Sequence, residues 1–377
     1  MRIRRASVGT VVGALLASAL LAAAASPASA YVPDPGLPDE SNGGTTVMPM
    51  GDSITDGYTV PGGYRIKLWD DLTSDGYTVD FVGGSTPNGY GTSLGDHNHQ
   101  GQPGNDIASI AYRGLMSVEK YQPRTVLLLA SSNDLGSTDE FAAAAPGKLA
   151  KLIDDIHARD PNADIFVSTL LPQPNPTYEA RIEAFNAQVP GIVAARGDKV
   201  HLVNMYDALT VNDLSDGVHP TRAGYDKMAD VWYTALKSVP GALGQPVGKP
   251  VGLRVDGTNL CLDVAGASTT PLTQTIVWSC HGRANQQWTR TAAGELRVYG
   301  SDCLDVYGGL TAAGSRVVIY PCHGGTNQLW SYQDYGILYN GRSGRCAALE
   351  NGSTGQGTRI VLADCDASSS AQRWVLN

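Results

Sequence analysis

Apolar residues follow two different spacings along residues 45–239. Short apolar runs that are typical of β-strands cover residues 45–50, 78–82, 125–130, 163–170 and 199–205. Between and after these runs, apolar residues recur every three to four positions, as on one face of a helix, over residues 64–72, 107–115 and 149–156. Because strand and helix patterns alternate, we predict an α/β domain whose mostly parallel sheet is flanked by helices.

Four polar segments follow the predicted strands of this domain. They are GDSITDG around Ser53, HQGQPGND at residues 99–106, SSND at residues 131–134 and DGVHP at residues 216–220. Ligands of open α/β sheets bind at the carboxyl ends of the strands, so we expect these segments to meet at one edge of the sheet. Each segment alone has a simpler interpretation as a turn, because Asp, Ser, Gly and Pro favour turns for conformational reasons.

Residues 251–377 contain a threefold repeat instead. All six cysteines of the chain lie there in pairs 19 positions apart: Cys261/Cys280, Cys303/Cys322 and Cys346/Cys365. A similar motif follows each pair, as NQQW, NQLW and AQRW, ending at Trp288, Trp330 and Trp374. We predict three units packed around a pseudo-threefold axis, with the tryptophans in the core and one disulfide in each unit. Structural zinc is the alternative, but no CxxC spacing supports it.

The stretch PGALGQPVGKP, residues 240–250, separates the two patterns. Its three prolines and three glycines interrupt helices and sheet ladders. We therefore interpret it as a linker between a domain at residues 45–239 and a domain at residues 251–377. Residues 31–44 form an N-terminal extension in this interpretation.

The first thirty residues are typical of a secretory signal peptide. The basic start MRIRRAS precedes an apolar run that reaches Ala25, and Ala28-Ser29-Ala30 has the small-x-small form of a cleavage site. A membrane anchor is the alternative, but alanine dominates the run and a cleavage site follows it. We expect a secreted, extracellular protein, exported by the general secretory or the twin-arginine route, with disulfides that persist outside the cell.

The charge of the chain excludes some classes of partner. The formal net charge of −9 becomes −12 without the first thirty residues, which contain three arginines and no acidic residue. No Lys/Arg cluster suited to nucleic acid or to an anionic membrane is present in the sequence. We expect a monomer that binds a neutral ligand.

We expect neither a metal nor another cofactor. Asp96, His97 and His99 in the segment DHNH lack a recognisable metal-ligand spacing. Arg65 lies in a predicted helix, where we expect it to face solvent or a carboxylate rather than a substrate.

The four polar segments resemble the sequence blocks of the SGNH hydrolases, also called the GDSL family, over residues 45–239. GDSITDG matches the serine block, HQGQPG the glycine block, SSND the asparagine block and DGVHP the closing Asp-x-x-His. The segments MPMGDSITDG, GGYRIKLW and DFVGG further resemble the branch with the family 3 carbohydrate esterases, which remove acetyl groups from xylan. The resemblance implies an SGNH-type three-layer α/β/α fold. One departure is that Ser131 and Ser132 stand where this family usually has glycine.

Ester hydrolysis assigns roles to the residues in these blocks. Ser53 is the expected nucleophile and His219 the general base, because an imidazole can accept the serine proton near neutral pH. Asp216 is expected to hold the imidazole in the correct tautomer. The expected oxyanion donors are the backbone N–H groups of Ser53 and Gly104 and the side-chain amide of Asn133, with Gly101 as the alternative to Gly104. Asp52 and Asp56 are expected to order the serine turn.

The repeats resemble the ricin-type β-trefoil lectins, also classed as family 13 carbohydrate-binding modules, over residues 251–377. The resemblance implies an all-β domain with a sugar site in each repeat, formed by an aspartate, an aromatic residue and an Asn-Gln pair. The first two repeats retain all of these residues: Asp263, Trp278, Asn285 and Gln286 in the first, and Asp305, Tyr320, Asn327 and Gln328 in the second.

The third repeat has lost the residues expected to bind a sugar. Ala348, Ala363 and Ala371 replace the aspartate, the aromatic residue and the asparagine, and only Gln372 remains. Sugar recognition needs an aromatic face and hydrogen-bonding groups, so we predict two working sites and one silent repeat.

Together, the two halves predict a secreted serine esterase, an acetylxylan esterase in particular, with a xylan-binding lectin domain. A lipid or aryl esterase with a sugar-binding module is one alternative, because the same triad would serve a wider apolar pocket. A lectin that carries an inactive hydrolase fold is the other.

Overall fold

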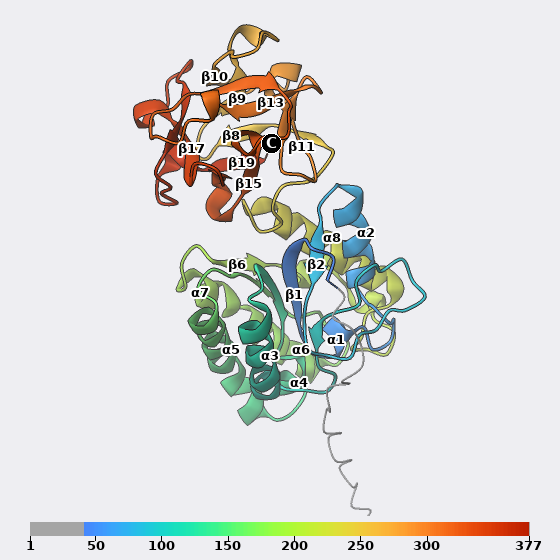
Figure 1. Cartoon of the computed structure of the whole chain (residues 1–377). Helices are drawn as coiled ribbons and strands as arrows, with labels where there is room; N and C mark the ends of the chain where they lie inside the picture. The colour runs from blue at the N-terminus through green and yellow to red at the C-terminus, as the bar shows by residue number, and fades with distance from the viewer. Residues whose placement is uncertain (1–40, 377) are drawn as a thin grey trace, which may run out of the picture.

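The computed structural model describes residues 41–376, which form two domains that follow one another along the chain (Figure 1). The predicted signal peptide, residues 1–30, and most of the predicted extension lie outside the described residues. Within residues 41–376, no helix combines the length and apolar character needed to cross a bilayer.

The first domain is built on a parallel sheet, as predicted. Its strands are β1 (Thr45–Gly51), β2 (Val79–Phe81), β3 (Gln100–Gly101), β4 (Thr125–Leu129), β5 (Asp164–Ser168) and β6 (Val200–Val203). The strand order is β2-β1-β4-β5-β6, with the two-residue β3 paired to the end of β1. Every pair in this sheet is parallel. β4 is buried along its whole length, as its uninterrupted apolar sequence predicts for a central strand.

Helices connect these strands and cover both faces of the sheet (Figure 1). They are α1 (Ser53–Asp56), α2 (Arg65–Ser74), α3 (Ile107–Tyr121), α4 (Ser132–Leu135), α5 (Asp139–Arg159), α6 (Pro176–Asn186), α7 (Val189–Ala194) and α8 (Arg222–Ser238). α2 packs against α8, and α3 packs against α5. Right-handed crossovers toward β2 on one side of β1 and toward β4 and β5 on the other place α2 on one face and α3 and α5 on the opposite face. α8 follows the last strand of the sheet and joins α2.

The direction of the connections reverses between β1 and β4. The chain leaves β1 toward β2 on one side, and later adds β4, β5 and β6 on the other side. The loops after β1 and β4 therefore diverge and leave a crevice at their carboxyl ends, which is where open α/β sheets bind ligands. Ser53 follows β1 directly, and Asn133 lies shortly after β4.

The second domain is all-β and has the predicted trefoil character. Its strands are β7 (Pro250–Val251), β8 (Leu253–Val255), β9 (Leu260–Val264), β10 (Thr275–Ser279), β11 (Trp288–Arg290), β12 (Leu296–Val298), β13 (Asp302–Val306), β14 (Val317–Pro321), β15 (Trp330–Tyr332), β16 (Leu338–Asn340), β17 (Arg345–Leu349), β18 (Ile360–Ala363) and β19 (Trp374–Leu376). The strands pair antiparallel in three sheets. Short 3₁₀ turns connect several of them, and three of these turns contain the Asn-Gln or Ala-Gln positions of the repeats.

Each repeat places its tryptophan in the shared core. Trp288, Trp330 and Trp374 are buried, and their indole N–H groups donate to backbone carbonyls of the first long strand in each repeat. One disulfide closes each repeat, as Cys261–Cys280, Cys303–Cys322 and Cys346–Cys365. Each disulfide stabilises the domain by about 2–4 kcal/mol, because it restricts the unfolded chain.

The segment predicted as a linker packs against both domains, and its contact with the trefoil is a hydrogen bond from the Gly248 N–H to the Arg290 carbonyl at 2.8 Å. Ala242 is buried in the core of the first domain. The Val247 N–H donates to the Gly76 carbonyl at 2.6 Å, and Lys249 pairs with Asp75 at 2.8 Å. The trefoil therefore adjoins the amino ends of the parallel strands, on the side of the sheet opposite to the crevice (Figure 1).

Candidate functional site

The serine turn begins where β1 ends. Asp52 is buried, and its Oδ1 accepts the Ile54 N–H at 2.9 Å, so it caps the one-turn helix α1. Burial raises the pKa of Asp52, and the Ile54 N–H opposes this effect. Gly57 ends the helix at φ +84°, a conformation that glycine adopts without strain. Asp52 thus orders the turn that presents Ser53, as the sequence predicts.

Ser53, His219 and Asp216 form one chain of hydrogen bonds. His219 Nε2 lies 2.9 Å from Ser53 Oγ, and His219 Nδ1 lies 2.8 Å from Asp216 Oδ2. The geometry fits a neutral imidazole that donates from Nδ1 to the carboxylate and accepts from the serine hydroxyl at Nε2. The structure therefore places Ser53 and Asp216 at the two ring nitrogens of His219.

Asp216 is held as a charged carboxylate. Partial burial acts to raise its pKa, but hydrogen bonds from the His219 backbone N–H, the His219 ring and the Val218 N–H outweigh burial. Their net effect lowers the pKa of Asp216 to about 2. The carboxylate is therefore ionised well into acid and can stabilise a positive charge on the imidazole.

The three expected oxyanion donors belong to residues that line one cavity. The Ser53 N–H is in the first turn of α1, where N–H groups have no intrahelical acceptor. Gly104 lines the same cavity and is exposed. Asn133 also lines the cavity, and its amide donates one hydrogen to the Asn105 carbonyl at 2.9 Å. The second amide hydrogen of Asn133 can then serve a ligand.

Gly101, the alternative oxyanion donor, has a different environment. Its N–H donates to His99 Nδ1 at 3.0 Å. A Cβ atom at this position would lie 2.4 Å from the Asp56 nitrogen, so glycine is required here for close packing. These contacts favour Gly104 over Gly101 as the donor to a ligand.

The departure at Ser131 has a visible backbone consequence. Ser131 has φ +114°, in the left-handed region that glycine occupies more easily than serine. Its side chain is buried, and its hydroxyl has no hydrogen-bond partner among the described residues. The loop that carries Asn133 therefore keeps a shape that suits glycine, at a cost in stability.

The catalytic residues open onto a cavity of about 520 Å³. Its walls are formed by Ser53, Tyr58, Pro103, Gly104, Ser132, Asn133, Tyr178, Val218 and His219. They come from segments that follow β1, β3, β4, β5 and β6, so all four predicted polar segments reach this edge of the sheet. The loop of residues 99–106 includes the short strand β3, which the sequence pattern did not reveal.

Arg65 and the DHNH segment make buried contacts next to the serine turn. Arg65 is buried and donates to the carbonyls of Asp56 and His97, so the expectation that it faces solvent is wrong. Its charge does interact with the nearby carboxylates of Asp56 and Asp96. Both ring nitrogens of His99 are engaged, Nδ1 by Gly101 and Nε2 by the Thr86 carbonyl at 3.0 Å. The pKa of His99 is held well below its usual range, first by burial and then by the Arg65 charge.

The first two trefoil repeats contain matching polar clusters. Asp263 Oδ2 accepts hydrogen bonds from Asn285 and Gln286, both at 2.8 Å. Beside this cluster, Trp278 leaves 43% of its surface exposed.

The second repeat has the same arrangement. Asp305 Oδ2 accepts from Asn327 at 2.9 Å and from Gln328 at 2.8 Å, and Tyr320 is 38% exposed. Each of the two repeats therefore combines an ordered carboxylate with an exposed aromatic ring, as expected for a sugar site.

Histidines that follow the second cysteine join these two clusters. His281 Nε2 lies 3.5 Å from Asp263 Oδ2, and His323 Nε2 lies 3.6 Å from Asp305 Oδ2. The sequence prediction did not include them. A Cys-His dipeptide that occurs in the first two repeats and not in the third was the available signal.

The retained glutamine of the third repeat has a structural role. Gln372 accepts the Asp366 N–H at 3.0 Å and donates to the Asp364 carbonyl at 2.9 Å, which brackets the second cysteine of that repeat. Gln286 and Gln328 make the same two backbone contacts in their repeats. The glutamine thus holds the disulfide loop whether or not the repeat has a sugar site.

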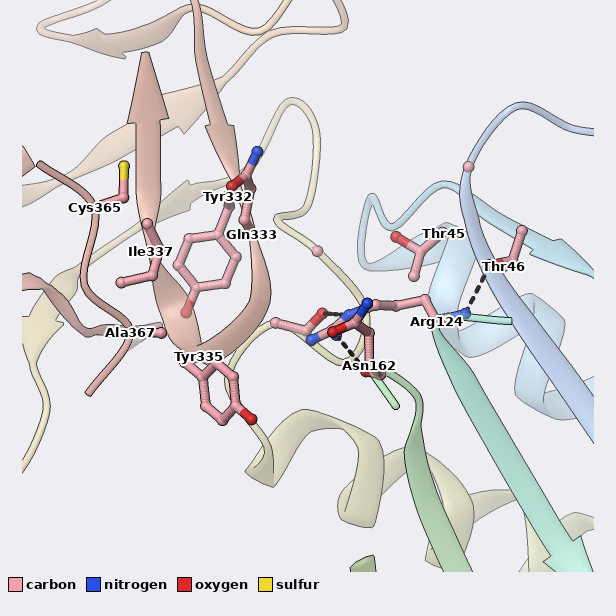
Figure 2. A pocket seen from close by; sticks show the side chains of 13 residues that line it. Thr45, Thr46, Arg124, Asn162, Tyr332, Gln333, Tyr335, Ile337, Cys365 and Ala367 are labelled. Carbon is pink, nitrogen blue, oxygen red and sulfur yellow. Dashed lines mark hydrogen bonds between the residues drawn. The ribbon is translucent and has the colours of Figure 1, made fainter. Parts of the chain in front are cut away.

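A second cavity, of about 690 Å³, lies where the two domains meet (Figure 2). Thr46 and Arg124 line it from the first domain, and Tyr332 and Tyr335 line it from the trefoil. Its polar groups bond to the protein itself: Arg124 donates to the Gly241 carbonyl at 3.1 Å, and Thr46 Oγ1 accepts the Arg124 N–H at 2.8 Å. This cavity is at the amino ends of the strands, away from Ser53.

Comparisons with known proteins divide the chain in the same way. Residues 50–227 match the GDSL-like lipase/acylhydrolase family, and residues 250–374 match the ricin-type β-trefoil lectin domain. The chain is 30% identical over 224 residues to a multidomain esterase of Ruminococcus flavefaciens. That alignment covers 52% of this chain and only 28% of the relative.

Solved structures resemble each domain separately. A family 3 carbohydrate esterase from Clostridium thermocellum is 34% identical, with 51% of this chain and 94% of that chain covered and a TM-score of 0.44. A designed threefold-symmetric protein, ThreeFoil, is 31% identical, with 34% of this chain and 96% of that chain covered and a TM-score of 0.32.

The fold and the family matches define the class of each half. The chain contains a GDSL-like esterase domain followed by a ricin-type β-trefoil lectin domain.

Proposed function

We propose that this protein is a secreted carbohydrate esterase that removes O-acetyl groups from xylan or a related plant polysaccharide. The observation that carries the proposal is the hydrogen-bonded chain of Ser53, His219 and Asp216 at an open cavity. The same polypeptide has a lectin domain with two complete clusters of sugar-binding type. A sugar-binding domain would bring the esterase domain to a polysaccharide, and this favours a carbohydrate ester as the substrate.

The reaction begins with attack of Ser53 Oγ on the acyl carbonyl carbon. The serine proton passes to His219 Nε2, and Asp216 stabilises the imidazolium that forms. The carbonyl oxygen becomes an oxyanion, which accepts hydrogen bonds from the N–H groups of Ser53 and Gly104 and from the amide of Asn133. The hydrogen bond from Asn133 to the Asn105 carbonyl supports this role, because a side chain that is already held needs little reorganisation when charge develops.

The tetrahedral intermediate then collapses. His219 donates its proton to the sugar oxygen as the C–O bond breaks, and the acyl group remains on Ser53 as an ester. A water molecule enters, loses a proton to His219 and attacks the acyl carbon. A second tetrahedral intermediate breaks down to acetate and restores the Ser53 hydroxyl.

The lectin domain binds the polysaccharide in this proposal. Asp263 and Asp305 use Oδ2 for their protein contacts, which leaves Oδ1 to accept sugar hydroxyls. The rings of Trp278 and Tyr320 supply exposed faces for stacking. Two weak sites on one polymer bind much more tightly than either site alone.

The trefoil acts as an anchor rather than as an extension of the active-site cavity. It adjoins the amino ends of the strands, whereas the cavity lies at their carboxyl ends. The seven residues of β1 separate these ends by about 20 Å, at about 3.3 Å per residue.

Hydrolysis assays on three substrate classes test the proposed function. Purified protein is given acetylated xylan, acetylated chitin fragments and a series of nitrophenyl esters of increasing acyl length, and the released acid is measured. The proposal predicts a preference for acetylated xylan and for acetyl over longer acyl groups. A marked preference for long acyl chains would contradict it and favour a lipid esterase.

A further inference from the structure

Two tyrosines line the catalytic cavity, and their surroundings differ. Tyr178 is half-buried, and its hydroxyl donates to the Ser132 carbonyl. Tyr58 leaves 64% of its surface exposed at the rim. Packing within the domain therefore explains the position of Tyr178, whereas the exposed ring of Tyr58 is available to a ligand.

Hydrogen bonds from Tyr58 and its neighbour Thr59 connect this segment to Ser53 and to the loop that carries His219. The Tyr58 N–H donates to the Ser53 carbonyl at 3.1 Å, immediately after the left-handed Gly57. The next residue, Thr59, donates its hydroxyl to the Pro220 carbonyl at 3.2 Å, beside His219. An exposed aromatic side chain is thus attached at two points next to the nucleophile and the general base.

The ring of Tyr58 lies on the histidine side of the cavity. Its centroid is 5.2 Å from that of His219, and the two rings are tilted by 37°. In ester hydrolysis His219 must deliver its proton to the departing alcohol oxygen, so the alcohol part of the substrate lies next to this imidazole. A side chain that contacts His219 from the rim is therefore placed to meet the alcohol rather than the acyl group.

We propose that Tyr58 is the platform on which the sugar ring that carries the scissile ester stacks, and that it selects for sugar esters over esters of simple alcohols. The inference rests on the proposed function. The apolar C–H face of a pyranose packs against an aromatic ring, while its hydroxyls stay in water. Tyr58 would thereby act on the alcohol half of the substrate without taking part in proton transfer.

The test compares two acetate esters that share the acyl group and differ in the alcohol. One is an acetylated xylooligosaccharide, and the other is ethyl acetate, which has no ring. Tyr58→Ala should lower the ratio of kcat/KM for the sugar ester to kcat/KM for ethyl acetate about tenfold, through a higher KM for the sugar ester. Tyr58→Phe keeps the ring and should keep the ratio within about twofold.

Tyr112→Ala is the matched control. Tyr112 is 74% exposed on α3 and does not line the catalytic cavity, so its removal should leave the ratio as in wild type. An equal loss on both esters in Tyr58→Ala, with an altered pH profile, would show that Tyr58 acts through His219 and overturn the proposal. An unchanged ratio would also overturn it, while the proposed function would stand. Failure of the wild type to deacetylate the sugar ester would overturn both.

Discussion

His219 Nε2 lies 2.9 Å from Ser53 Oγ, although 166 positions separate the two residues in the chain. The loop that carries His219 is closed on itself, because the Ser215 N–H donates to the His219 carbonyl at 2.8 Å. Asp216 accepts hydrogen bonds from the backbone and the ring of His219 within the same loop. The imidazole is therefore oriented toward Ser53 before any substrate is bound.

Asp216 should stay ionised over the pH range in which the enzyme works. Hydrogen bonds from His219 and Val218 lower its pKa to about 2, so the carboxylate remains charged well into acid. Asp216 therefore adds no titration above about pH 3, and kcat/KM on ethyl acetate should not fall more steeply than about tenfold per pH unit there. A fall of a hundredfold per pH unit would show that a second group titrates in that range.

Asp216→Asn should lower kcat about 10⁴-fold, because it disturbs the tautomer of His219.

Removal of the Asn133 amide should affect catalysis more than binding. Asn133→Ala should lower kcat about 10²–10³-fold, with a small change in KM, because the amide stabilises charge that develops in the transition state. Steady-state kinetics on ethyl acetate measure this effect. Thermal unfolding of the variant provides the control, because Asn133 also binds the Asn105 carbonyl. Activity within a few-fold of wild type in a folded variant would exclude Asn133 as an oxyanion donor.

Ser131→Gly should make the protein more stable. The substitution relieves a left-handed serine and removes a buried hydroxyl that has no partner in the described structure, so the free energy of unfolding should rise by about 1 kcal/mol. Ser131→Ala removes the hydroxyl and keeps the backbone strain, which separates the two causes. Denaturant unfolding measures both variants. A less stable Ser131→Gly protein would show that the serine contributes a contact that outweighs its strain.

Loss of the two trefoil carboxylates should separate binding from hydrolysis. Asp263→Ala combined with Asp305→Ala should weaken binding to insoluble xylan and leave hydrolysis of ethyl acetate as in wild type, because the cavity lies at the far ends of the strands. Pull-down on insoluble xylan and acetate release measure the two properties. Asp364→Ala, in the third repeat, is the matched control and should bind normally. Normal binding by the double variant would disprove the assigned sugar sites.

Sequence patterns predicted the parts of the fold that depend on local spacing. The strands β1, β4 and β5 begin within one residue of the predicted apolar runs, because a buried parallel strand needs a continuous apolar sequence. The repeat spacing predicted the disulfide in each unit. The position of the polar segments, each after a predicted parallel strand, predicted that Ser53 and His219 would meet, because the carboxyl ends of such strands share one edge of the sheet.

Features that depend on tertiary contact were not predictable in the same way. The left-handed backbone of Ser131 arises from the loop after β4, and serine gives no local signal for it. The helical pattern around Arg65 predicted a surface position, yet its side chain donates to the carbonyls of Asp56 and His97 in the interior. The contact of Val247 with Gly76 of the first domain was not predictable either. The Pro/Gly-rich composition of its segment indicates only that helices and strands are interrupted.

The central claim is that Ser53 performs the deacetylation, and one measurement tests it most directly. Acetate release from acetylated xylan is followed for the wild type and for Ser53→Ala, with thermal unfolding and xylan binding as controls that both proteins are folded. We predict steady release by the wild type and none above background by Ser53→Ala, with xylan binding unchanged. Equal release by the two proteins, or none by a folded wild type, would contradict the account.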